Sequence, residues 1–206
     1  NLNFLVNQST LIEEHIAGIP GDHFIKEFLP QCTDAEKAQI AKEYVKFNER
    51  SMIRLLGDMR AYNYVVVPTH DFDQVVYKIR PIDFDQQSFE GKLSVYRPQF
   101  FKENKALMDL VRTKLNHNSI NQYKIEERSI VARRIISSGS RLQSLVRIMQ
   151  SETLTLQENL ERLRQEIFKF TKDKAFKQSE SMGDIMQASL RFVRLHYEKV
   201  DMHNLF

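Results

Sequence analysis

The sequence predicts an α+β fold that is mainly helical, and three observations indicate it. Residues 33–56 show helical periodicity behind a capping signature, two β-branched runs follow at residues 64–84, and the chain beyond residue 105 has almost only helical patterns. The 206 residues are 42% hydrophobic, which is enough for one large domain or two small ones with a hydrophobic core.

The net charge and the cysteine content of the chain limit the kinds of ligand and the compartment that we expect for this protein. A net charge of +3 suits anionic ligands in general and is too small to be typical of a nucleic-acid-binding protein. The single cysteine, Cys32, excludes a disulfide framework and favours a reducing, cytoplasmic location. No apolar run is long enough to span a bilayer, and no basic-then-apolar leader opens the sequence. Because the first residue is Asn1 rather than Met, we expect a fragment or a processed chain.

The elements up to residue 104 follow from local patterns. Residues 10–12 predict a short strand, and Gly18, Pro20 and Gly21 predict a turn after it. Thr33 and Glu36 have the spacing of a capping box and predict the start of a helix, which Gly57 should end. The runs YVVVP and QVVYKIRPIDF, separated by the polar THDFD, predict a β-hairpin. Residues 88–104 lack periodicity and predict an ordered loop held by its aromatic residues, Phe89, Tyr96, Phe100 and Phe101.

The second half of the chain predicts a group of helices. Their expected ranges are residues 105–115, 119–136, 141–149, 156–170 and 182–197, and Ser181 with Asp184 gives the last one a cap signature. We therefore divide the chain into residues 1–24, residues 25–104, which carry the first helix and the hairpin, and a helical subdomain of residues 105–206.

Four polar residues stand at the ends of these predicted elements. Asp58, Arg60 and Asn63 lie in the short stretch GDMRAYN between the helix and the hairpin, and Asp83 ends the second hairpin strand. An antiparallel hairpin returns the end of its second strand to the start of its first, so Asp83 should lie near Asn63. Magnesium prefers carboxylate and amide oxygens together with substrate phosphates, which Asp83 and Asn63 suit. A second carboxylate at Asp58 can position a hydroxyl nucleophile, and the Arg60 cation can neutralise a phosphoryl group in transfer.

The stretch GDMRAYN resembles the catalytic loop of the kinase-like phosphotransferases, which include aminoglycoside phosphotransferases, phosphoinositide kinases and HipA-type kinases. Their loops begin Gly-Asp and carry Asn five positions after the Asp, as Asp58 and Asn63 do here. The sequence IDFD resembles their metal-binding motif, with Asp83 in the metal position, and TLIEEHIAGIPG is similar to their hinge strand and linker. The resemblance covers residues 10–88 in order, with a helical remainder.

The resemblance implies a kinase-like C-lobe with a small β-hairpin that carries the metal site. It implies ATP and Mg²⁺ as cofactors, a small molecule or an atypical protein as the hydroxyl acceptor, and no nucleic-acid partner. Asp58 and Arg60 would be catalytic, Asn63 and Asp83 would bind the metal, and the hinge residues Glu13, Glu14 and His15 would contact the nucleotide.

The sequence departs from the family in two places. Arg60 stands where the small-molecule kinases have His and the protein kinases have Lys. No Gly-rich phosphate loop and no strand with a nucleotide-binding Lys precede the hinge, so the small lobe is absent from this sequence. We therefore expect these residues alone to hold nucleotide weakly or not at all.

Other interpretations stay open. Asp58 and Asn63 can be ordinary turn formers, and Arg60 can pair with a surface carboxylate instead of a phosphate. The chain can be a non-catalytic module for protein or nucleic-acid binding. For nucleic-acid binding, the late helices offer a basic stripe, which consists of Arg128, Arg133, Arg134, Arg141 and Arg147. The commoner explanation of such a stripe is a solvated helix face.

Overall fold

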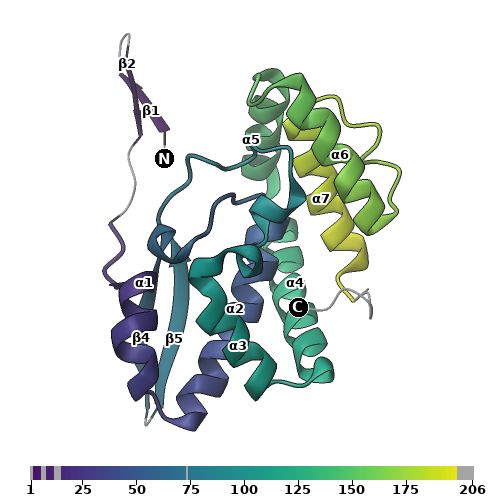
Figure 1. The fold of residues 1–206 in the computed structure, drawn as a ribbon. Coiled ribbons are helices and arrows are strands. Elements are labelled where there is room, and N and C mark those ends of the chain that lie inside the picture. The colour runs from purple at the N-terminus through teal and green to yellow at the C-terminus, as the bar shows by residue number, and fades with distance from the viewer. Residues whose placement is uncertain (1, 6–7, 12–14, 73, 199–206) are drawn as a thin grey trace.

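The computed structural model describes residues 2–5, 8–11, 15–72 and 74–198 and has an α+β fold in which helices predominate (Figure 1). A three-stranded antiparallel sheet has the order β3 (Ile19–Pro20), β4 (Tyr64–Asp71) and β5 (Gln74–Pro81). The pairing of β4 with β5 confirms the predicted hairpin, whose register runs from Tyr64 opposite Pro81 to Asp71 opposite Gln74.

Two further strands, β1 (Leu2–Leu5) and β2 (Gln8–Leu11), form a separate antiparallel pair. The strand predicted at residues 10–12 therefore exists as far as Leu11, and Ile12 lies outside the described residues.

The helix α2 (Asp34–Ile53) lies in the middle of the molecule (Figure 1). The sheet and α3 (Lys105–Lys114) lie on one side of it, and α4 (His117–Ser137) lies on the other. It begins at the predicted capping box: Thr33 Oγ1 accepts from the Glu36 amide, and Glu36 Oε2 accepts from the Thr33 amide at 2.8 Å. The hydrogen bonds that the Thr33 amide and hydroxyl donate to the Glu36 carboxylate hold the pKa of Glu36 below its usual value.

The prediction that Gly57 ends α2 is wrong, because the helix ends at Ile53. Leu55 turns the chain out of the helix with a φ of 49°, and the Leu56 amide then bonds back to the Ser51 carbonyl at 2.9 Å. Gly57 serves a close approach instead. A Cβ at this position would lie 2.5 Å from the carbonyl oxygen of Gln86, so only glycine fits beside the segment that follows β5.

Residues 21–31 are helical, where the sequence predicts only a turn at Gly18–Gly21. The three consecutive pieces are α1 (Gly21–His23), a π-helix (Phe24–Phe28) and a 3₁₀ turn (Leu29–Gln31), and together they lie beside β4 (Figure 1). Phe24 is fully buried in the core between α2 and the sheet. Burial of this apolar side chain in the tertiary structure therefore stabilises a helical segment whose local helical signals are weak.

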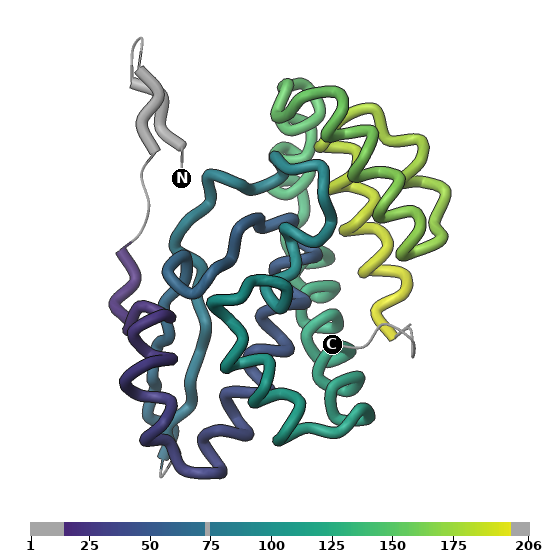
Figure 2. The backbone as a smooth tube through the Cα atoms, viewed as in Figure 1, coloured from purple at the N-terminus to yellow at the C-terminus, as the bar shows by residue number. Residues whose placement is uncertain are grey.

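Residues 88–104 form the predicted ordered loop, and three short 3₁₀ turns interrupt it: residues Leu93–Tyr96, Pro98–Phe100 and Lys102–Asn104. Figure 2 shows the backbone crossing from the sheet toward the side of the molecule that holds α5 (Gly139–Ser151) and α7 (Met182–His196), and returning into α3. Tyr96 anchors the loop as expected, since its side chain is buried and its hydroxyl donates to the Glu90 carbonyl at 2.7 Å. Phe89 and Phe100 do not, because they are 40% and 58% exposed.

All five predicted late helices are confirmed. They are α3 (Lys105–Lys114), α4 (His117–Ser137), α5 (Gly139–Ser151), α6 (Gln157–Thr171) and α7 (Met182–His196), and Ser181 and Asp184 cap the last as a capping box. None of the described helices combines the length and the apolar character needed to cross a bilayer.

Two large apolar clusters fill the interior. The first joins α2 and the sheet to α3 through Leu107, Met108 and Val111. The second joins α6 and α7 to the 88–104 loop, and Leu55 from the end of α2 belongs to it. The segment between α2 and β4, which carries Asp58, therefore begins at a buried residue, Leu55, that packs in the same cluster as α6 and α7.

Candidate active site

The loop between α2 and β4 holds Asp58 in an uncommon backbone conformation. Asp58 has a φ of 53°, in the left-handed region that only a few per cent of residues other than glycine adopt. Its amide donates to the Val95 carbonyl at 3.2 Å, and its carbonyl accepts from the Arg60 amide at 2.7 Å. The loop is thus fixed from both sides, and such imposed conformations concentrate at functional sites.

Asn63 closes this loop from the inside. Its side-chain Nδ2 donates to the Asp58 carbonyl at 2.7 Å and more weakly to Asp58 Oδ2 at 3.4 Å. Asn63 is 8% exposed and ends the 3₁₀ turn Ala61–Asn63 that leads into β4. Because both bonds use the amide nitrogen, Oδ1 is the atom of this side chain that stays available to a ligand.

Arg60 lies against Asp58. Its Nε donates to Asp58 Oδ1 at 2.7 Å, and an Nη approaches Glu103 Oε1 at 3.4 Å. The hydrogen bond and the charge of Asp58 raise the pKa of Arg60 above its ordinary value. The guanidinium carbon also lies 5.3 Å from the centre of the Phe101 ring. Asp58, Arg60 and Glu103 have side chains that are 31%, 37% and 22% exposed, so solvent reaches all three.

The hairpin brings Asp83 to the same end of the sheet as Asn63. Tyr64 pairs with Pro81, and beyond this pair the Ile82 amide donates to the Asn63 carbonyl at 3.1 Å. Asp83 is the next residue. The segment that contains it is joined to the start of the loop by a bond from the Ser88 amide to the Leu55 carbonyl at 2.9 Å.

The Asp83 carboxylate is not part of the hydrogen-bond network of Asp58, Arg60 and Asn63. Its Oδ1 accepts from the Asp85 amide at 3.2 Å, which is the bond of an Asx turn. Asp85 is itself exposed. The second carboxylate oxygen of Asp83 therefore remains for a ligand.

The predicted nucleotide contacts are placed only in part. Glu13 and Glu14 lie outside the described residues, and His15 is exposed ahead of β3. The structure thus gives no geometry for a nucleotide at these three positions.

No group of three or more His, Cys, Asp or Glu residues in the described part of the chain could hold a metal ion. Asp83 and Asn63 offer one carboxylate and one amide oxygen, which is too little for a metal site made by the protein alone. This set of one carboxylate and one amide oxygen suits Mg²⁺, which usually takes one or two protein ligands and completes its coordination shell with phosphates and water.

Two contributions to this site have no signal in the sequence. Glu103 binds Arg60 across 43 positions of sequence, and Val95 lends its carbonyl to the Asp58 amide. Both come from the 88–104 loop, whose aperiodic sequence does not predict where its residues fold back.

The five arginines of the basic stripe differ in their exposure to solvent. Arg128 is withdrawn from solvent, with a side chain 12% exposed and Nε 2.7 Å from Glu49 Oε2. The remaining four arginines are exposed, as on a solvated helix face.

Comparison with known proteins finds no family model, no curated protein and no solved structure that matches this chain. Its function is therefore inferred from the geometry of the loop that carries Asp58.

Proposed function

We propose that this chain is the large lobe of an ATP- and magnesium-dependent phosphotransferase, with Asp58 at the reacting hydroxyl. The observation that supports it best is the closure of the Asp58–Asn63 loop by the 2.7 Å bond from Asn63 Nδ2 to the Asp58 carbonyl. This bond uses the nitrogen of the amide and leaves its oxygen for a ligand, and the Asn63 backbone is joined by the Ile82 amide to the strand end that precedes Asp83. One carboxylate for a hydroxyl and two oxygens for a cation are the parts that phosphoryl transfer requires.

In this proposal each residue has a separate task. Asp58 accepts a hydrogen bond from the acceptor hydroxyl and takes its proton as the hydroxyl oxygen attacks the γ-phosphorus of ATP. The bond from that phosphorus to the bridging oxygen breaks, and ADP leaves with the bonding electron pair. Asn63 Oδ1 and Asp83 would hold the magnesium ion, which, when bound, offsets charge on the phosphate oxygens.

In this proposal Arg60 has one partner before a phosphoryl group binds and another partner afterwards. At rest its guanidinium is bound to Asp58 Oδ1 and approaches Glu103. A phosphoryl group is a stronger, bidentate partner for arginine, so its arrival would draw Arg60 off Asp58 and free that oxygen for the acceptor.

The test uses the longest natural chain that contains these residues, and the control is Asp71→Ala. Asp71 is an exposed aspartate at the opposite end of the same hairpin. Asp58→Ala should lower turnover by about 10²- to 10⁴-fold, as expected for loss of a general base. Asp83→Ala should abolish magnesium-dependent nucleotide binding, while Asp71→Ala changes neither. Full turnover in Asp58→Ala, or retained nucleotide binding in Asp83→Ala, would remove that residue from its role.

A non-catalytic module is the second candidate, and the ion pair of Asp58 with Arg60 favours it. A carboxylate oxygen occupied at 2.7 Å by an arginine of the same loop is also what a purely structural turn would show. Calorimetry with ATP and Mg²⁺ separates the two functions. Absence of both binding heat and thermal stabilisation in the longest natural chain would support the module.

A further inference from the structure

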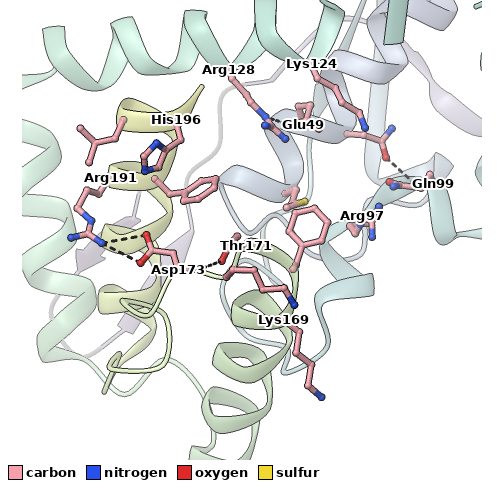
Figure 3. Close-up of a pocket in the computed structure, with 16 residues that line it drawn as sticks. Glu49, Arg97, Gln99, Lys124, Arg128, Lys169, Thr171, Asp173, Arg191 and His196 are labelled. Carbon is pink, nitrogen blue, oxygen red and sulfur yellow. Dashed lines mark hydrogen bonds and ion pairs between the residues drawn. The ribbon is translucent and has the colours of Figure 1, made fainter. Parts of the chain in front are cut away.

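A large cavity lies apart from the Asp58 loop. Its volume is about 830 Å³, and its walls come from the C-terminal half of α2, from the 88–104 loop, from α4, from the end of α6 and from α7 (Figure 3). None of Asp58, Arg60, Asn63 and Asp83 lines it. The volume falls within the range of sites for small organic molecules.

The cavity carries an excess of positive charge. Two carboxylates line it, and both are already paired: Glu49 with Arg128 at 2.7 Å and Asp173 with Arg191 at 3.3 Å (Figure 3). Six lysine and arginine residues line it as well, namely Arg97, Lys124, Arg128, Lys169, Lys172 and Arg191. Among the residues that the structure describes, Arg97, Lys169 and Lys172 belong to no ion pair. The cavity therefore lacks the negative charge that would balance it.

Arg97 is fixed in place before any ligand arrives. Its guanidinium carbon lies 4.7 Å from the centre of the Phe100 ring and 5.6 Å from that of Phe170. The Gln99 side-chain oxygen, in the amide orientation that satisfies its neighbours, accepts from Nε and an Nη of Arg97 at 3.1 and 3.0 Å. Burial lowers the pKa of Arg97 from its ordinary value, which indicates a largely desolvated cation. The N–H groups that Gln99 does not use remain for an anion.

The inner side of the cavity is apolar. A narrower pocket shares Met52, Phe170 and Phe192 with it and reaches inward to Leu55 and Val193. That inner pocket holds only about 50 Å³, so a ring has to lie in the main cavity, against its apolar side. The cavity thus has two parts, its cations and this apolar side, and a ligand that uses both needs a charged end and an apolar or aromatic body.

We propose that this cavity binds a small organic phosphate. The phosphate lies at Arg97 and Lys172, and the aromatic or apolar body packs against Phe170 and Phe192. A phosphate monoester suits the site better than a carboxylate because it brings about two negative charges to several cations and can bind arginine through two oxygens. The recessed shape and the aromatic walls favour a small molecule over the exposed backbone of a nucleic acid.

The test is calorimetry on the full chain at fixed ionic strength, with naphthyl phosphate, naphthol and inorganic phosphate as separate probes. Naphthyl phosphate should bind at least about tenfold more tightly than either fragment, because only it uses both parts of the cavity. Equal affinity for naphthyl phosphate and inorganic phosphate would overturn the proposal.

Variants locate the site. Arg97→Gln should weaken naphthyl phosphate binding about 10- to 100-fold, the loss expected for charge-assisted hydrogen bonds. Because Arg97 also packs in the interior, the second variant is Lys172→Glu at an exposed position, with an expected loss of about tenfold. Lys174→Glu is the matched control, since it makes the same charge change two residues away and outside the cavity. Equal losses in Lys172→Glu and Lys174→Glu would mean unspecific attraction and would overturn the site.

Three further outcomes are decisive. Binding of naphthyl phosphate should survive Asp83→Ala, so that failure of the proposed phosphotransferase leaves this inference standing. Nucleotide binding that is lost in Lys172→Glu but kept in Asp83→Ala would support the cavity and count against the magnesium site. Binding of a single-stranded RNA oligomer more tightly than naphthyl phosphate, with the same variants affected, would overturn the proposal of a small-molecule site.

Discussion

The side-chain amide of Asn63 has a structural task that can be tested independently of any activity. Its Nδ2 donates to the Asp58 carbonyl at 2.7 Å, which also accepts from the Arg60 amide. Asn63→Ala removes one of these two donors and should lower the free energy of unfolding by about 0.5–1.5 kcal/mol, the usual net contribution of one hydrogen bond. Asn63→Asp should cost more, since it replaces the donor by a carboxylate that faces the Asp58 carboxylate. Urea denaturation at pH 7 measures both changes.

Asn118 provides the control for these substitutions. It is exposed on α4, and Asn118→Ala should change the free energy of unfolding by no more than about 0.5 kcal/mol. Wild-type stability in Asn63→Asp would show that the amide nitrogen is not the donor to Asp58, and the assignment of its oxygen to a cation would then be lost.

At the scale of single residues, the sequence predicts which residues belong to the candidate site better than it predicts which groups contact them. Asp58, Asn63 and Asp83 stand out because each lies at the end of a recognisable element, and hairpin geometry alone predicts that the last two are neighbours. Glu103 and the Val95 carbonyl could not be predicted, because each approaches the loop from an aperiodic segment about 40 positions away along the chain.

The start of α7 gives an element-scale prediction about pH. Burial opposes ionisation of Asp184, but hydrogen bonds from Gln150 Nε2 at 2.7 Å and from the amides of Glu180 and Ser181 at 3.0 and 2.9 Å hold its pKa below the ordinary value. A lowered folded-state pKa adds stability that is complete above the unfolded-state value of about 4 and disappears as pH falls through the folded-state value. The stability advantage of the wild type over Asp184→Asn should therefore be largest near neutral pH and shrink below about pH 4.

Urea denaturation of the two proteins at a series of pH values checks this, and Ser181→Ala is the companion variant. It removes the hydroxyl that accepts from the Asp184 amide at 3.0 Å and should cost about 1 kcal/mol at neutral pH. An Asp184→Asn difference that stays constant from neutral to acid pH would contradict the ionised cap.

Elements were predictable where one local rule determines them. Capping boxes at Thr33 and Ser181 and the apolar periodicity behind them predict both helices, and β-branched runs around a polar turn predict the hairpin. Residues 21–31 escape such rules, because a π-helix and a 3₁₀ turn follow one another there and no single period describes them. The end of α2 escapes as well, since Leu55, not a glycine, adopts the left-handed turn.

A buried ionic network, which no single element reveals, ties the sheet, α2 and α4 together. Glu43 on α2 is 2% exposed, and its Oε1 accepts from Arg50 at 2.7 Å and from the Ile79 amide of β5 at 3.1 Å. Arg50 in turn lies 3.3 Å from Glu127 on α4. The network therefore links the sheet and α2 to α4 in the second half of the chain. It could not be predicted, because its members are separated by up to 84 positions. The basic cavity escaped prediction for the same reason, since its cations come from distant segments.

Loss of Glu43 should destabilise the molecule as a unit. Glu43→Ala removes the acceptor of the Ile79 amide and one of the two carboxylates of Arg50, so the free energy of unfolding should fall by about 3–5 kcal/mol. Glu43→Gln keeps an acceptor and loses only the charge, so its cost should be smaller, at about 1–2 kcal/mol. Glu161→Ala, at an exposed position of α6, should stay within about 0.5 kcal/mol of the wild type.

Amide hydrogen exchange distinguishes a local from a global effect of Glu43→Ala. Because the same network holds α2, β5 and α4, exchange should accelerate at Ile79 and also along α4, far from the substitution in sequence. Acceleration confined to β5 would mean that Glu43 serves only one strand. The sheet and the late helices would then be separately stable, and the Asp58 loop would lie at a junction that can move rather than on a rigid support.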